Sequence, residues 1–156
     1  MQRVLAAFLV IAAVLWSAAI LLAPFALTSR RPWLSGAAAV LYQTAGLICH
    51  QRPERSFHLA GVQQPVCGRC TGLYLSAAAS ALAAFVVGRA GVSRPRDVRT
   101  MLVVAALPIV ASVALEQLGL VSQSNETRAL SALPLGAVGA WVFIRSLLAE
   151  GARTAL

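Results

Sequence analysis

Long runs of apolar residues limit what this chain can fold into more than any other feature. The first run extends from Val4 to Leu27 and is interrupted only by Ser17 and Pro24. A helix needs about 20 such residues to cross the roughly 30 Å hydrocarbon core of a bilayer. The whole chain is 59% hydrophobic and 12% charged, whereas soluble domains carry about 25% charged residues. We therefore expect an all-α, polytopic membrane protein in which residues 1–156 form a single transmembrane domain.

Four further apolar segments follow the first run. They are Trp33–Cys49, Thr71–Gly88, Met101–Val121 and Ala129–Leu148. The last three are long enough to span a bilayer, whereas 33–49 is near the lower limit and either crosses the membrane or lies along its interface. Five spans place more arginines in the cytoplasm than four, so we expect five. We expect the first run to be a retained helix, because it is longer than the h-region of a cleaved signal peptide, about 7–15 residues.

The arginines predict how the chain is oriented. All thirteen basic residues are arginines, the net charge is +8, and four of them lie between Arg89 and Arg99. Arginine-rich short loops stay in the cytoplasm. We therefore expect the polar segment that precedes Thr71, and the 122–128 connector, on the extracytoplasmic side of the cell membrane, and the C-terminus in the cytoplasm.

The same pattern bears on partners. Arginines in short loops between spans suit lipid head groups, so we expect membrane lipid and no nucleic acid as a partner. Small residues in the helices allow close packing, which makes a homo-oligomer possible. The sequence does not identify a protein partner.

A polar segment, Cys49–Tyr74, interrupts the apolar runs. It contains all three cysteines of the chain and both histidines. Cys67 and Cys70 form a CxxC pair, Cys49 supplies a third thiol, and His50 or His58 a fourth ligand. Tetrahedral zinc accepts such Cys3His sets. A zinc centre is therefore the leading interpretation of this segment.

Two other interpretations of the thiols stay open. The CGRC sequence at the start of a helix resembles a dithiol active site, because a helix N-terminus and Arg69 both favour a thiolate. A membrane thiol-disulfide oxidoreductase of this kind would pass electrons to quinone, with Cys49 as a third thiol. A structural disulfide, or thiols that only fill space, is the remaining alternative. The sequence does not decide whether the protein is an enzyme.

Charged residues on the same predicted membrane face form a second group. Glu116 lies near the end of an apolar run, where an ionisable residue is costly and usually faces a partner or a wet cavity. We expect it to reach Arg52, Arg55, Arg69 or Arg128. The arginines either bind an anion such as a lipid phosphate, or reach the interface and pair with acidic residues, and we favour the second. Ser124 or Asn125 is expected to cap a helix. The candidate anion-binding or supporting residues are Arg52, Glu54, Arg55, Arg69, Glu116, Asn125 and Arg128.

The residues CHQRPERSF at 49–57 and PVCGRCTGLY at 65–74 resemble the signature of a family of small prokaryotic membrane proteins, domain-of-unknown-function family 2085. The resemblance covers about residues 42–139, but it is looser after Ser124, and Ser131-Ala132 stands where the family has Thr-Gly. It implies a membrane protein without an established activity, substrate or cofactor. The motif contains His50 and not His58, which favours His50 as the fourth ligand. The motif residues are Cys49, His50, Gln51, Pro53, Glu54, Arg55, Ser56, Phe57, Cys67, Arg69, Cys70, Thr71, Gly72 and Tyr74.

Overall fold

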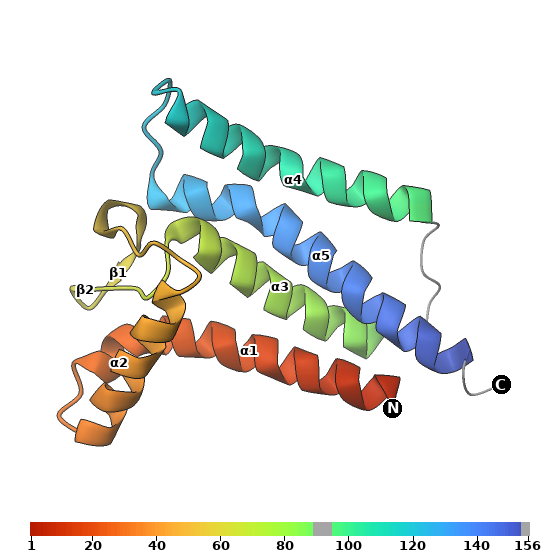
Figure 1. Ribbon diagram of the computed structural model, residues 1–156, viewed down its shortest axis with the longest axis horizontal. Helices are drawn as coiled ribbons and strands as arrows, with labels where there is room; N and C mark the ends of the chain where they lie inside the picture. Colours follow the sequence, from red (N-terminus) through yellow and green to blue (C-terminus); the bar gives the residue numbers. More distant parts are fainter. Residues whose placement is uncertain (89–94, 154–156) are drawn as a thin grey trace.

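Four long helices lie side by side in the computed structural model, which describes residues 1–88 and 95–153 (Figure 1). They are α1 (Gln2–Leu27), α3 (Gly68–Val87), α4 (Pro95–Gln117) and α5 (Asn125–Arg153). In the described residues these four are long and apolar enough to cross a membrane. The expected all-α, polytopic architecture is confirmed.

A shorter helix, α2 (Pro32–Gly46), is steeply inclined to the others at one end of the bundle (Figure 1). Its 15 residues reach only about 22 Å at 1.5 Å per residue, less than the hydrocarbon core. The preference for a fifth span at 33–49 is therefore corrected to the four-span alternative. Pro32 at the first helical position starts α2, because its missing N–H would have no helical partner there.

Two other expected boundaries change. The helix α4 begins at Pro95 and not at Met101, so Arg96 and Arg99 belong to a helix, while Arg89 and Arg94 lie outside the described residues. Asp97 in its first turn suits the positive end of the helix dipole. The helix α5 begins at Asn125, within the segment expected to be a connector up to residue 128. The backbone N–H of Thr127 donates to Ser124 Oγ at 3.3 Å, which confirms Ser124 as the expected N-cap.

Small residues bring α3 and α5 into close contact. A Cβ on Gly68 would lie 2.7 Å from the carbonyl oxygen of Asn125, and Cβ atoms on Gly72 and Gly136 would overlap backbone atoms of the facing helix. Ser80 also donates to the carbonyl oxygen of Ala137 at 2.7 Å. This packing fixes the first turn of α3 against the start of α5.

The segment between α2 and α3 contains a single turn of 3-10 helix, η1 (Pro53–Arg55), and two short antiparallel strands, β1 (His58–Leu59) and β2 (Val62–Gln63). Ala60 and Gly61 turn the hairpin with positive φ angles of 51° and 78°. All of these elements lie at the end of the bundle where α3 and α5 begin (Figure 1). The polar Cys49–Tyr74 segment thus lies at one end of an apolar bundle.

Candidate metal centre

Hydrogen bonds of glutamine side chains hold the polar segment against the helices. Gln51 has a φ of 48°, and its Nε2 donates to the carbonyl oxygens of Tyr42 at 2.7 Å and Pro65 at 2.8 Å. Gln63 donates in turn to the carbonyl oxygen of Gln51 at 2.5 Å. Gln51 therefore connects α2 to the residues just before α3, which brings Cys49 towards Cys67.

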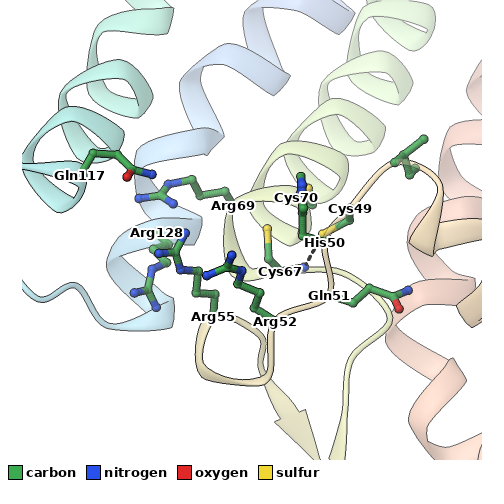
Figure 2. Close-up of a pocket in the computed structure, with 11 residues that line it drawn as sticks. Cys49, His50, Gln51, Arg52, Arg55, Cys67, Arg69, Cys70, Gln117 and Arg128 are labelled. Atoms are coloured by element: carbon green, nitrogen blue, oxygen red, sulfur yellow. Dashed lines mark hydrogen bonds between the residues drawn. The ribbon is translucent and has the colours of Figure 1, made fainter.

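Cys49, Cys67 and Cys70 form a thiol cluster whose sulfur atoms all lie within 4.8 Å of one another. Cys67 is the N-cap residue of α3, and Cys70 lies in the first turn of that helix. The Cys67 backbone N–H donates to Cys49 Sγ at 3.2 Å (Figure 2). All three thiols are free. In a tetrahedral zinc site with Zn–S bonds of about 2.3 Å, sulfur atoms are about 3.8 Å apart, so the cluster is compact enough to hold one ion.

The surroundings of Cys49 favour its thiolate. Hydrogen bonds from the side chains of Cys67 and then Cys70 lower the pKa of the Cys49 thiol well below its usual value, although burial opposes this shift. The residue is only 6% exposed. A thiolate is the form of cysteine that binds metal.

An apolar floor supports the thiol cluster. Cys49 is packed with Ile20 of α1 and with Val66, and the half-buried Trp16 and Tyr74 lie against the same group. The rings of Trp16 and Tyr74 meet edge to face, with centroids 6.0 Å apart. The thiols therefore have an apolar environment on one side, which strengthens electrostatic interactions with any ion that they bind.

On the other side, the thiols border a cavity of about 390 Å³. This volume is within the range of small-molecule sites, about 300–1,000 Å³. Figure 2 shows the arginine side chains gathered beside the thiols, from the polar segment, from α3 and from α5. The other lining residues are Ile48, His50, Gln51, Arg52, Arg55, Arg69, Gln117 and Arg128.

Three of these arginines contact Glu116, which lies near the end of α4. Its carboxylate lies 2.5 Å from Arg69 Nη2, 2.8 Å from Arg128 Nη2 and 3.5 Å from Arg55 Nε. We call these three arginines, from η1, α3 and α5, the arginine cluster. The Glu116 side chain is 11% exposed, so the contacts form largely out of water. Of the four expected partners of Glu116, Arg52 is not among those it contacts, because Arg52 lies 4.0 Å from Glu54 at the exposed surface.

Other polar groups position the arginine cluster. Arg128 Nη1 donates to Asn125 Oδ1 at 2.8 Å and to the carbonyl oxygen of Glu54 at 3.2 Å. Asn125 donates to the carbonyl oxygen of Ser56 at 2.9 Å. These bonds attach the start of α5 to the polar segment. Asn125, through its side chain, and Glu54, through its backbone carbonyl, therefore position Arg128.

Sequence reasoning missed Ser112 and Gln123. Arg69 Nη2 lies 3.1 Å from Ser112 Oγ and 3.4 Å from Gln123 Oε1, and Ser112 donates to that same Gln123 oxygen at 2.6 Å. A lone serine within the apolar run of α4, one helical turn before Glu116, was the signal that could have identified Ser112.

The histidines occupy different places. His50 lines the cavity and is exposed, but it does not belong to the group of described ligand atoms within 4.8 Å of one another. His58 lies in β1 and is also exposed. The structure therefore brings three of the four predicted ligands together and places the fourth, His50, at the edge of the same cavity.

Comparison with known proteins places the chain in a family. A family described as predicted membrane protein (DUF2085) matches residues 49–142, and the chain belongs to this family. The match begins at Cys49 and includes the thiol cluster, the arginine cluster and Glu116. The protein is therefore a membrane protein of a family whose function is not established.

Two curated relatives are similar over short segments. The chain is 52% identical over 40 residues to an uncharacterised protein of Methanothermobacter thermautotrophicus, which covers 26% of this chain and 36% of that protein. It is 53% identical over 34 residues to an uncharacterised protein of Methanocaldococcus jannaschii, or 22% of each chain. The matches thus span about a third of one relative and about a fifth of the other. No solved structure matches the chain.

Proposed function

We propose that this membrane protein binds one zinc ion through the thiolates of Cys49, Cys67 and Cys70. The observation that carries the proposal is the mutual distance of the three sulfur atoms, all within 4.8 Å. A disulfide would use two of these thiols and leave the third, whereas a tetrahedral ion uses all three. Zinc is the best match because it combines a preference for thiolates with tetrahedral geometry.

We propose His50 as the fourth ligand. It follows Cys49 directly and lines the same cavity as the thiols, and its exposed side chain is free to change its torsion angles when the ion binds. Zinc with four protein ligands is typical of structural sites, whereas a catalytic site keeps one position for water or substrate. Replacement of His50 therefore also tests which kind of site this is.

The test compares the zinc affinity of purified single variants. Cys49→Ser, Cys67→Ser and Cys70→Ser are each expected to lose zinc binding, because two thiolates hold zinc much more weakly than three. His50→Ala is expected to keep one zinc per chain with an affinity lower by about tenfold, roughly 1.4 kcal/mol. His58→Ala is the matched control and should bind like the wild type.

Two results would contradict parts of this proposal. Zinc binding that survives replacement of any one cysteine would exclude that cysteine as a ligand. Equal affinities for His50→Ala and His58→Ala would remove His50 from the ligand set and leave the fourth position to a molecule in the cavity.

A second candidate function is thiol oxidation. Cys67 and Cys70 lie at the N-terminus of α3 and border the cavity, and a quinone from the bilayer would be the electron acceptor. In that reaction the two thiols would lose two electrons and two protons to form a disulfide, and the quinone would become a quinol. Cys49→Ser distinguishes the candidates, since it abolishes zinc binding but leaves the Cys67–Cys70 pair able to form a disulfide.

We place the site on the extracytoplasmic side. Four of the thirteen arginines lie between Arg89 and Arg99 in the sequence. Of these, Arg96 and Arg99 lie near the start of α4, at the end of the bundle opposite the thiol cluster, and Arg89 and Arg94 lie outside the described residues. Arginine-rich loops favour the cytoplasm. With four spans, the N-terminus and the C-terminus are then both cytoplasmic.

A further inference from the structure

We propose that the cavity beside the thiol cluster binds a phosphate group through Arg55, Arg69 and Arg128. This proposal goes beyond the zinc centre, because it assigns a ligand to the rest of the cavity. The three arginines all line the cavity, and they come from three separate elements that the fold brings to one place. The ligand is either a free phosphate compound or the head group of a phospholipid.

The charges of the site do not balance without an anion. Glu116 is the one carboxylate within 4.0 Å of these three guanidinium groups in the described residues, so the group carries a surplus of two positive charges. The side chains of Arg128 and Arg69 are only 9% and 14% exposed. Like charges held together out of water repel one another, and a compensating anion lowers the cost of burying them.

Bound zinc would not remove this surplus. Three thiolates and one Zn²⁺ sum to a single negative charge, which compensates one of the two surplus positive charges. A positive charge therefore remains when the zinc site is filled. A phosphate monoester carries about −1.5 to −2 charges at pH 7 and three strong acceptor oxygens. It can therefore compensate the surplus positive charge whether or not zinc is bound.

The arginines also have donors to offer. All the hydrogen bonds of the Arg69 side chain in the described residues are made by Nη2, and its buried Nε has no hydrogen-bond partner there. Across residues 1–88 and 95–153, the Arg55 side chain makes one ion-pair contact, at 3.5 Å, and is 31% exposed. A guanidinium group can donate two parallel hydrogen bonds to a phosphate. Arg55 is therefore the arginine best placed to reach a ligand, while Glu116 and Ser112 hold Arg69 in position.

Two helix N-termini add to the same field. The helix α3 begins at Gly68 and α5 at Asn125, and these two residues are in close contact. The N-terminus of a helix carries a partial positive charge that favours anions. The cavity therefore combines the dipoles of two helix N-termini with the guanidinium donors of the arginine cluster.

The experiment measures binding of labelled inorganic phosphate to the full chain in detergent by equilibrium dialysis. Arg55→Gln should weaken binding by about tenfold or more, since it removes one charge-assisted contact. Arg55→Lys keeps the charge but not the paired donors, so its affinity should lie between those of Arg55→Gln and the wild type. The control is Arg3→Gln, which removes an equal charge from the opposite end of the bundle and should not change the affinity.

A second arm distinguishes the source of the phosphate. Short-chain phosphatidic acid is titrated into the same samples and its binding is followed by native mass spectrometry, with short-chain phosphatidylcholine as the control lipid. Binding of inorganic phosphate indicates a free phosphate compound, and binding of phosphatidic acid alone indicates a lipid. Binding of neither, or equal binding by Arg55→Gln and Arg3→Gln, would overturn the proposal.

Zinc content is measured on every sample, so that failure of the phosphate site and failure of the zinc centre are distinguishable. Arg55 is not a proposed zinc ligand, and Arg55→Gln should keep the zinc content of the wild type. Loss of phosphate binding with unchanged zinc content would assign the two ligands to separate residues of one cavity.

Discussion

Glu116 is the residue on which the electrostatics of the site depend. Three guanidinium groups approach its carboxylate, and the two closest belong to arginines that are nearly buried. The carboxylate, which belongs to α4, also contacts side chains from η1, α3 and α5. We therefore expect this single side chain to contribute to stability as well as to the shape of the cavity.

Glu116→Gln should strongly destabilise the protein, because it leaves Arg69 and Arg128 without their charge partner. Removal of one member of a buried ion pair costs about 3–5 kcal/mol. The measurement is the thermal midpoint of unfolding in detergent. Glu54→Gln is the matched control, since the Glu54 side chain is 62% exposed and lies 4.0 Å from Arg52, and such surface pairs contribute about 0–1 kcal/mol. Equal midpoints for the two variants would show that the arginines do not depend on Glu116.

At the scale of helices, the contact between α3 and α5 determines where the thiols and arginines lie. Cys67, Arg69 and Cys70 are all in or next to the first turn of α3, and Arg128 is in the first turn of α5. The glycines at the contact set the distance between the two helix axes. A change in this distance should therefore affect the site without touching any of its residues.

Gly72→Ala tests this dependence. The added Cβ would overlap the backbone carbonyl of Ala129, so the helices must separate, and we expect loss of stability together with weaker zinc binding. Gly139→Ala is the control within α5, since a Cβ there meets nothing within 4 Å, and the substitution should be neutral or slightly stabilising because alanine favours a helix. Zinc binding of wild-type affinity in Gly72→Ala would contradict the role of the α3–α5 contact.

The sequence was sufficient to predict the long helices and most partners of Glu116. It could not predict the role of the 33–49 segment or the contacts of Ser112 and Gln123, for physical reasons. The long apolar runs identified the four long helices. Glu116 was expected to reach Arg52, Arg55, Arg69 or Arg128, and it contacts the last three. The 33–49 segment was ambiguous because its length lies at the limit for a span, and length alone cannot tell a short span from a helix at the interface. Ser112 and Gln123 were not predicted, because their contacts with Arg69 depend on how α3 and α4 are placed in space.

In the whole molecule, the thiol cluster and the arginine cluster lie at one end of the bundle, and α1 begins and α5 ends at the other (Figure 1). This arrangement follows from four spans, since an even number of crossings returns the chain to the side from which it started. With four spans, Arg30 and Arg31 lie on the same side of the membrane as the thiol cluster, whereas five spans would place them in the cytoplasm. The four arginines between Arg89 and Arg99 are then the main support for the proposed orientation.

Labelling of introduced cysteines tests the orientation in intact cells. Thr28→Cys lies in the exposed turn between α1 and α2, and Thr100→Cys lies near the start of α4, at opposite ends of the bundle. A thiol reagent that does not cross membranes should label Thr28→Cys above the wild-type level and should leave Thr100→Cys unlabelled until the cells are opened. The reverse pattern would place the site in the cytoplasm.

The zinc centre is tested most directly by a measurement of metal content and reactive thiols on one sample of the wild-type protein, purified in detergent without chelator or reductant. We expect about one zinc per chain, with all three thiols unreactive until a chelator is added and reactive afterwards. Absence of zinc together with one reactive thiol would contradict the zinc centre and indicate a disulfide. Absence of zinc together with three reactive thiols would contradict both the zinc centre and the disulfide.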